Sequence, residues 1–258
     1  MEKQNDFIRR YSLIIGVHLV VIAVWHGVVV GFDLPSYVIA TPLATLMSLA
    51  DPDYPWMHNI MVTATEIFGG YLLGVVVGVG MALAFSWFRF LNIVFMPLVV
   101  SLNMIPKVAL GPVFIVWFDY GLGPNIIIAF MISFLPILIT TTRGLLEVEP
   151  ELLDLVRSLK GSRWQIFTKI QLPGSLPYIF SGMKVAVVLA VAGAIVGEFI
   201  ASEEGLGYLM MQVQVDLDTP AMFMAVLMIT FVGVSLYGIV LLLERIFVKS
   251  DSRLEAAA

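Results

Sequence analysis

The stretch ELLDLVRSLKGSRWQIFTKIQLP, residues 151–173, is the most polar part of an otherwise apolar chain. It contains four of the fourteen basic residues, and long apolar runs lie on both sides of it. In its first half, apolar residues recur on one side of a short helix that begins near Pro150 and stops at Gly161. We expect a second short helix over RWQIFTKI (163–170), ended by Leu172–Pro173. The stretch therefore predicts two short helices joined by a turn.

Composition places this polar stretch in a membrane protein. Of 258 residues, 60% are hydrophobic and 13% are charged, with a mean hydropathy of +0.97. Soluble domains have about 45–50% apolar and about 25% charged residues. The net charge of −5 lies in loops and ends without a basic patch, so no nucleic-acid partner is expected. With no cysteine and three scattered histidines, neither a metal site nor a cofactor is expected.

The apolar runs predict the number of membrane crossings. About 20 apolar residues span the hydrocarbon core as a helix. We expect an all-α integral membrane protein with six transmembrane helices, over about 11–32, 60–85, 91–118, 125–142, 178–200 and 221–243. The first run is too long for the apolar core of a signal peptide, so we interpret it as a retained anchor.

Basic residues set the orientation of these helices. With the N-terminus in the cytoplasm, twelve of the fourteen Lys and Arg residues fall on the cytoplasmic side. The outside segments 33–59, 119–124 and 201–220 contain none. Both termini are therefore predicted to be cytoplasmic. The expected divisions are a cytoplasmic N-terminus (1–10), a transmembrane domain (11–247) with a cytoplasmic loop (143–177), and a C-terminal tail (248–258).

The third run is unusual because it contains Pro97, Pro106 and Pro112. Each proline removes an amide donor and disturbs the preceding turn, so this span should be kinked or broken. Lys107 lies beside the middle proline. The segment either packs as a kinked helix whose lysine reaches the interface, or it lines a pathway.

Small residues recur every fourth position in two other spans. Gly70, Gly74 and Gly78 share one face of the second span, and Ala186, Ala190, Ala194 and Glu198 share one face of the fifth. Such stripes favour close helix packing in membranes.

Ionisable residues inside the spans are candidates for a translocation path, since burying them in a membrane is costly. We expect Glu66, Lys107 and Glu198 to lie on such a path, with Glu66 and Lys107 paired or sharing a wet cavity. An alternative function is a secondary transporter that relays ions through these residues and Lys184, although six spans show no internal repeat.

The polar stretch resembles a cytoplasmic motif of permease subunits from binding-protein-dependent ABC importers. That motif reads E-A-A, three residues, G, nine residues, I, one residue, L-P. The spacing is met in full, but Asp and Leu-Val replace Glu and Ala-Ala, and Lys160 takes the glycine position, with Gly161 one place later. The matching positions are Asp154, Leu155, Val156, Lys160, Ile170, Leu172 and Pro173.

Other segments extend this resemblance over about residues 34–247. IPKVALGPVFIVWF (105–118), LPGSLPYIFSGMKVA (172–186) and GEFIASEEGLGYLM (197–210) are similar to the nitrate, sulfonate and taurine branch of these permeases. The resemblance implies a type I permease fold and a location in the bacterial inner membrane. It also implies a non-catalytic subunit, and the sequence contains no G-x-x-x-x-G-K-[ST] phosphate loop.

The resemblance further implies the partners and their contacts. A second permease subunit, as in a homodimer, completes the pore, ATP-binding subunits dock from the cytoplasm, and an extracytoplasmic binding protein delivers a small, often anionic solute. The loop residues implied to couple to the ATPase are the motif positions together with Gly161, Arg163 and Trp164. From the residues alone, an amphipathic helix here could equally lie on lipid headgroups.

The charge asymmetry makes a topological prediction. Cysteines introduced at Asp53 and Glu204 should react with an impermeant thiol reagent added to intact cells, because both positions lie in segments without basic residues. A cysteine at Ser162 should stay unlabelled. Labelling of Ser162→Cys in intact cells would contradict the orientation.

Overall fold

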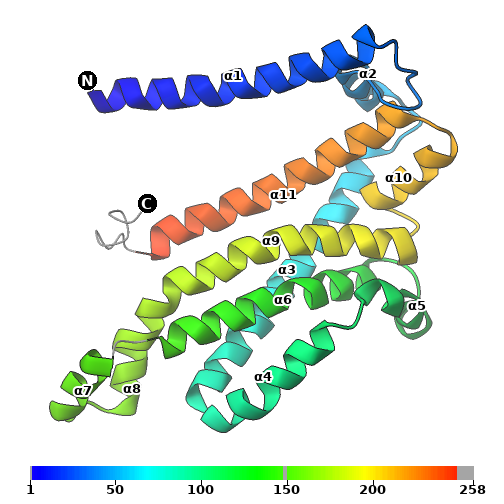
Figure 1. The fold of residues 1–258 in the computed structure, drawn as a ribbon. Helices are drawn as coiled ribbons and strands as arrows, with labels where there is room; N and C mark the ends of the chain where they lie inside the picture. The colour runs from blue at the N-terminus through cyan, green and yellow to red at the C-terminus, as the bar shows by residue number, and fades with distance from the viewer. Residues whose placement is uncertain (1, 148–149, 249–258) are drawn as a thin grey trace.

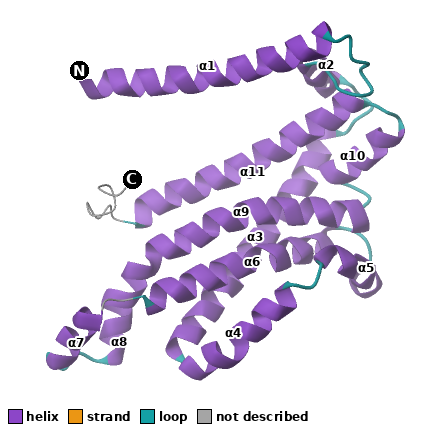
Figure 2. Ribbon diagram, in the orientation of Figure 1, coloured by secondary structure: helices purple, strands orange, loops and turns teal. Residues whose placement is uncertain are grey.

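The computed structural model describes residues 2–147 and 150–248, and within these residues it contains helices and turns but no β-strand (Figures 1 and 2). The long helices are α1 (Glu2–Gly31), α3 (Trp56–Trp87), α6 (Leu122–Leu146), α9 (Leu172–Ala201) and α11 (Thr219–Phe247). The shorter ones are α2 (Pro42–Met47), α4 (Arg89–Asn103), α5 (Gly111–Phe118), α7 (Pro150–Ser158), α8 (Arg163–Ile166) and α10 (Leu206–Val215). The all-α prediction is confirmed.

The number of long apolar helices differs from the predicted six. Among the described residues, five helical segments are long and apolar enough to cross a membrane. The predicted span over 91–118 is not one helix: α4 and α5 are separated by a 3₁₀ turn, Lys107–Leu110. Pro106 directly precedes that turn and cannot supply an amide donor to a continuous helix. The break expected from the prolines is therefore present, and it divides the predicted span over 91–118 into α4 and α5.

The core of the molecule is the packing of α6 against α3 and α9. Gly70, Gly74 and Gly78 of α3 are buried. The stripe on α9 is also buried, with Ala186, Ala190 and Ala194 fully inaccessible. Both stripes therefore do what their spacing predicts, which is to let neighbouring helices approach closely.

Side-chain hydrogen bonds hold together the ends of the helices that lie near α10. The Trp56 indole donates to the Ser48 carbonyl at 3.0 Å, and the Tyr54 hydroxyl donates to an Asp218 carboxylate oxygen at 2.6 Å. Thr219 donates to the Tyr37 carbonyl at 2.7 Å. These bonds connect the segment before α3 to the start of α11, so this end of the bundle is built from chain segments far apart in sequence.

The first helix lies apart from this core. In Figure 1, α1 runs beside the bundle and approaches it only near α2. Trp25 stacks on Phe223 of α11, with ring centroids 5.6 Å apart, and its indole donates to the Ala40 carbonyl at 3.0 Å. Most other side chains of α1 that the structure describes are exposed. The helix is therefore attached to the bundle by one end.

Parts of the predicted divisions fall outside the described residues. Of the expected tail, 248–258, only Val248 is described, and Met1 and residues 148–149 are likewise outside. The division into termini, transmembrane domain and loop stays a prediction.

Candidate functional site

The turn after α7 is made by the lysine that replaces the motif glycine. Lys160 adopts a left-handed backbone with φ of +57°, and the Gly161 amide donates to the Val156 carbonyl at 2.9 Å. This bond closes the helix in the way that a terminal glycine normally does. The prediction that Gly161 makes the turn is therefore wrong by one position, since Lys160 itself takes the unusual conformation.

Gly161 is needed for a different reason, which is space. A Cβ atom added there would lie 3.0 Å from the Val156 carbonyl oxygen and still closer to the Val156 side chain. The two consecutive positions therefore have different roles. Lys160 reverses the direction of the chain, and Gly161 has no side chain that would prevent the chain from passing close to α7.

The second short helix begins as predicted but does not end as predicted. Ser162 caps α8 by accepting from the Gln165 amide at 3.2 Å, and the Gln165 side chain accepts from the Ser162 amide at 2.8 Å. The chain then continues through a π-helical turn, Phe167–Gln171, directly into α9. Leu172–Pro173 therefore does not stop the helix, and Pro173 lies directly after the π-helical turn.

The predicted coupling residues fall into two groups. Leu155 and Trp164 are exposed, with 56% and 63% of their surface accessible, and Leu152 and Leu159 of the same loop are exposed too. Arg163 is exposed too, and like Trp164 it contacts Trp87 of its own chain, since it donates to the Trp87 carbonyl and lies over the Trp87 ring. Of the remaining positions, Asp154, Lys160 and Pro173 are exposed, and Val156, Gly161, Ile170 and Leu172 are half-buried.

Two of the predicted path residues meet in a buried polar cluster between α3, α6 and α9. Glu66 is fully buried and accepts from the Asn125 side chain at 2.7 Å. Glu198, 1% exposed, accepts from the Thr63 hydroxyl at 2.6 Å and from the backbone amides of Gly207 and Tyr208. The cluster fixes the N-terminal turn of α10 against α9.

Lys107 lies outside this cluster. Its ammonium group donates to the backbone carbonyl of Asn103 and, at 2.9 Å, to the Asn103 side-chain oxygen. The direct pairing of Glu66 with Lys107 is therefore wrong in this structure, because the two side chains have different partners. Lys184, named for the secondary-transporter alternative, forms an ion pair with Glu244 at 2.9 Å.

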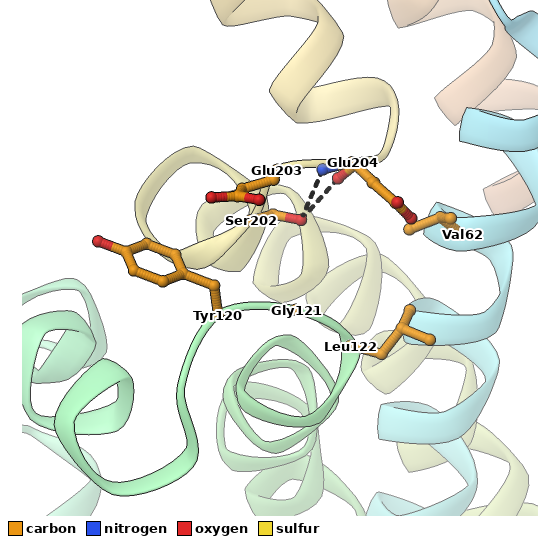
Figure 3. Close-up of a pocket in the computed structure, with 7 residues that line it drawn as sticks. All are labelled: Val62, Tyr120, Gly121, Leu122, Ser202, Glu203 and Glu204. Atoms are coloured by element: carbon orange, nitrogen blue, oxygen red, sulfur yellow. Dashed lines mark hydrogen bonds between the residues drawn. The ribbon is translucent and has the colours of Figure 1, made fainter.

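An open cavity of about 230 Å³ lies near the same end of the bundle. It is lined by Val62, Tyr120, Gly121, Leu122, Ser202, Glu203 and Glu204. Figure 3 shows Tyr120 and Glu203 on one side, while Glu204 extends toward Val62. Ser202 donates to the Glu204 carbonyl at 2.6 Å, which shapes this rim. The rim carries two carboxylates, and none of the three predicted path residues lines it.

Sequence reasoning missed Asn59, Thr63 and Asn125. Asn59 accepts from the Gly205 amide at 2.9 Å, and Thr63 accepts from the Leu206 amide at 2.8 Å. A signal existed, since Asn59, Thr63 and Glu66 are spaced four and three residues apart on one helix face. Polar residues aligned in this way in an apolar helix indicate a buried hydrogen-bond network.

The sequence of this chain is similar to a known protein family and to several individual proteins. Residues 70–249 match the family "Binding-protein-dependent transport system inner membrane component". A "Probable ABC transporter permease protein" of Haemophilus influenzae is 34% identical over 226 residues, which cover 87% of this chain and 91% of that protein. The formylaminopyrimidine transport permease ThiX of Halalkalibacterium halodurans is 28% identical, over 81% of this chain and 84% of its own length.

Two further similarities concern the branch and the fold. The taurine permease TauC of Escherichia coli is 25% identical, covering 87% of this chain and 84% of its length, as the sulfonate and taurine resemblance leads one to expect. A chain of the MetNI methionine ABC transporter, solved in inward facing conformations, has a TM-score of 0.56 and 18% identity. It covers 70% of this chain and 93% of its own, which confirms the type I permease fold.

The buried cluster predicts a stability effect that an exposed glutamate should lack. Glu198→Ala leaves the Thr63 hydroxyl and two backbone amides without their acceptor, at about 1–3 kcal/mol for each buried donor that stays unpaired. Thermal unfolding in detergent should therefore shift downward by several degrees. The matched control is Glu204→Ala, because the Glu204 side chain pairs with His58 at an exposed position, and its removal should be near neutral. Equal stability of the two variants would contradict a structural role for the cluster.

Proposed function

The chain belongs to the family of binding-protein-dependent transport system inner membrane components, and on this basis we propose that its 151–173 loop docks a separate ATPase subunit while its helices carry a small solute across the membrane. Members of this family are non-catalytic, multi-pass subunits of ATP-driven importers, which function with an ATP-binding subunit and a partner permease. The secondary-transporter alternative is therefore dropped.

The observation that carries the docking proposal is the exposed apolar surface of α7 and of Leu159, the residue directly after it. Leu152, Leu155 and Leu159 have 40%, 56% and 74% of their surface accessible, although they lie in the most polar stretch of the chain. In Figure 1, α7 and α8 project beyond the ends of α6 and α9. Apolar side chains exposed together outside a lipid-facing span favour a protein partner whose groove accepts a short amphipathic helix.

The family and the names of the relatives support proposals about the remaining partners and the solute. We propose a homodimer of this chain, an extracytoplasmic binding protein, and a location in the bacterial inner membrane. The solute is a small molecule of the kinds named for the relatives, such as a formylaminopyrimidine or taurine. Asp154 through Gly161, with Trp164, are proposed to contact the ATPase, while Ile170, Leu172 and Pro173 connect the loop to α9.

The translocation path is proposed to pass the break between α4 and α5. Irregular backbone at membrane depth persists only where protein or a wet cavity covers it. Met104 and Val116, on either side of the break, are 78% and 82% exposed in the single chain. A second copy and the transported solute together would cover this surface. Glu66 and Glu198 are proposed to support the path indirectly, by holding α3, α6 and α9 together.

Docking predicts a specific loss of ATPase association. Leu155→Glu should sharply reduce recovery of the ATPase subunit when the tagged permease is purified, because a carboxylate placed in an apolar groove costs about 1–3 kcal/mol. The fold should survive, because Leu155 is exposed. Leu155→Met keeps the apolar surface and should recover the ATPase as well as the original protein does. Undiminished recovery with Leu155→Glu would instead support a helix that lies on lipid headgroups.

The path predicts that the charge of Lys107 matters for transport. Lys107→Met should lower uptake about tenfold or more at equal membrane levels. The methionine side chain cannot form a charge-assisted hydrogen bond, and such a bond contributes about 1.5–3 kcal/mol. Lys107→Arg should retain most of the uptake. The measurement is accumulation of taurine or formylaminopyrimidine, whichever the original transporter takes up. Uptake by Lys107→Met at the original rate would remove Lys107 from the path.

A further inference from the structure

Arg163 connects the loop to the end of α3. Its guanidinium donates to the backbone carbonyl of Trp87, and its central carbon lies 4.7 Å from the centroid of the Trp87 ring. The two residues are 76 positions apart, and Trp87 is the last residue of α3. Helix C-termini carry partial negative charge on their unpaired carbonyl groups, so a cation is well placed there. The last turn of α3 has no basic residue of its own.

Two aromatic side chains of the loop complete this contact. The Trp87 ring lies 6.0 Å from the ring of Trp164 and 5.5 Å from that of Phe167, both in edge-to-face arrangements. Trp164 and Phe167 also pack on each other at 5.8 Å. Three loop residues, Arg163, Trp164 and Phe167, therefore hold Trp87, and we call this contact the Trp87 clasp.

The clasp joins the loop to the corner between α3 and α4. Only Phe88 separates α3 from α4, so Trp87 is at the corner from which α4 leads to the break at Lys107. The loop is also tied to α6, because Gln171 donates to the Leu145 carbonyl at 3.1 Å, and it is continuous with α9. Of these connections, the clasp is the one that reaches the α3–α4 corner.

We propose that Arg163 and Trp87 are positioning residues that transmit movement of the docked loop to α4, and that Arg163 does not itself contact the ATPase. This inference rests on the proposed docking function and adds the route by which docking would reach the broken segment. Without the clasp, the ATPase would still bind and the loop would still move, but α4 would no longer follow.

The absence of cysteine in the sequence allows a direct test by spin labelling. One label at Phe90→Cys reports on α4, and one at Lys169→Cys reports on the loop, since both side chains are exposed. Distances between the two copies are measured by double electron–electron resonance in the complete transporter, with and without a non-hydrolysable ATP analogue and Mg²⁺. In the original protein, the nucleotide should shift both distances.

Arg163→Gln should abolish the shift at Phe90→Cys while keeping the shift at Lys169→Cys and full recovery of the ATPase. Arg163→Lys keeps a cation for the Trp87 ring and should preserve part of the α4 shift. Trp87→Leu should resemble Arg163→Gln, and the double variant should be no worse than either. Arg143→Gln, which removes an exposed arginine at the end of α6, is the matched control and should keep both shifts.

Several results would overturn the proposal. If α4 shifts normally in both Arg163→Gln and Trp87→Leu, or does not shift in the original protein, the clasp transmits nothing. If Arg163→Gln loses the ATPase from the purified complex, Arg163 belongs to the docking surface, and the docking function stands while the clasp fails. Failure of docking itself is reported separately by Leu155→Glu.

Discussion

Close contact between the backbones of α3, α6 and α9 is the constraint on which the other features of this molecule depend. A Cβ atom added to Gly193 would lie 2.7 Å from the Ala129 Cα, and one added to Gly74 would lie 2.9 Å from the Ser133 hydroxyl. Lipid tails are as apolar as leucine, so helices in a membrane gain little by hiding apolar side chains from them. Association must come from packing and interhelical hydrogen bonds, and both require helices this close.

The buried polar cluster is a product of that closeness. Gly197 leaves room for Asn125, which reaches Glu66, and Gly205 and Gly207 let the start of α10 approach Glu198. Gly205 also has φ of +106°, a conformation open mainly to glycine. In a medium without water, each donor in the cluster needs an acceptor inside the protein. Close helix packing thus allows the cluster to hold the start of α10 in a fixed position next to α9.

Sequence patterns predicted features that depend on periodicity and length, and they failed where a contact joins distant positions. The glycine and alanine stripes, the break near Pro106 and the start of the second short helix at Arg163 follow from local spacing. A direct pair of Glu66 and Lys107 was expected from their depth in the membrane and their opposite charges, but each side chain has a different partner, Asn125 for Glu66 and Asn103 for Lys107. The contact between Arg163 and Trp87 could not be predicted either, because nothing in the sequence reveals that these two residues meet.

The loose attachment of α1 has a consequence for how this chain can vary. Cβ atoms added at Gly16, Gly27 or Gly31 would meet nothing within 4 Å, whereas the same addition at Gly193 would collide with backbone. A helix position that faces lipid tolerates any sufficiently apolar side chain, and the shape of that side chain has little effect on stability. Mutations should therefore accumulate freely along α1 as long as it stays apolar, with Trp25 as an exception. The two regions of one membrane protein would then drift at different rates over evolutionary time.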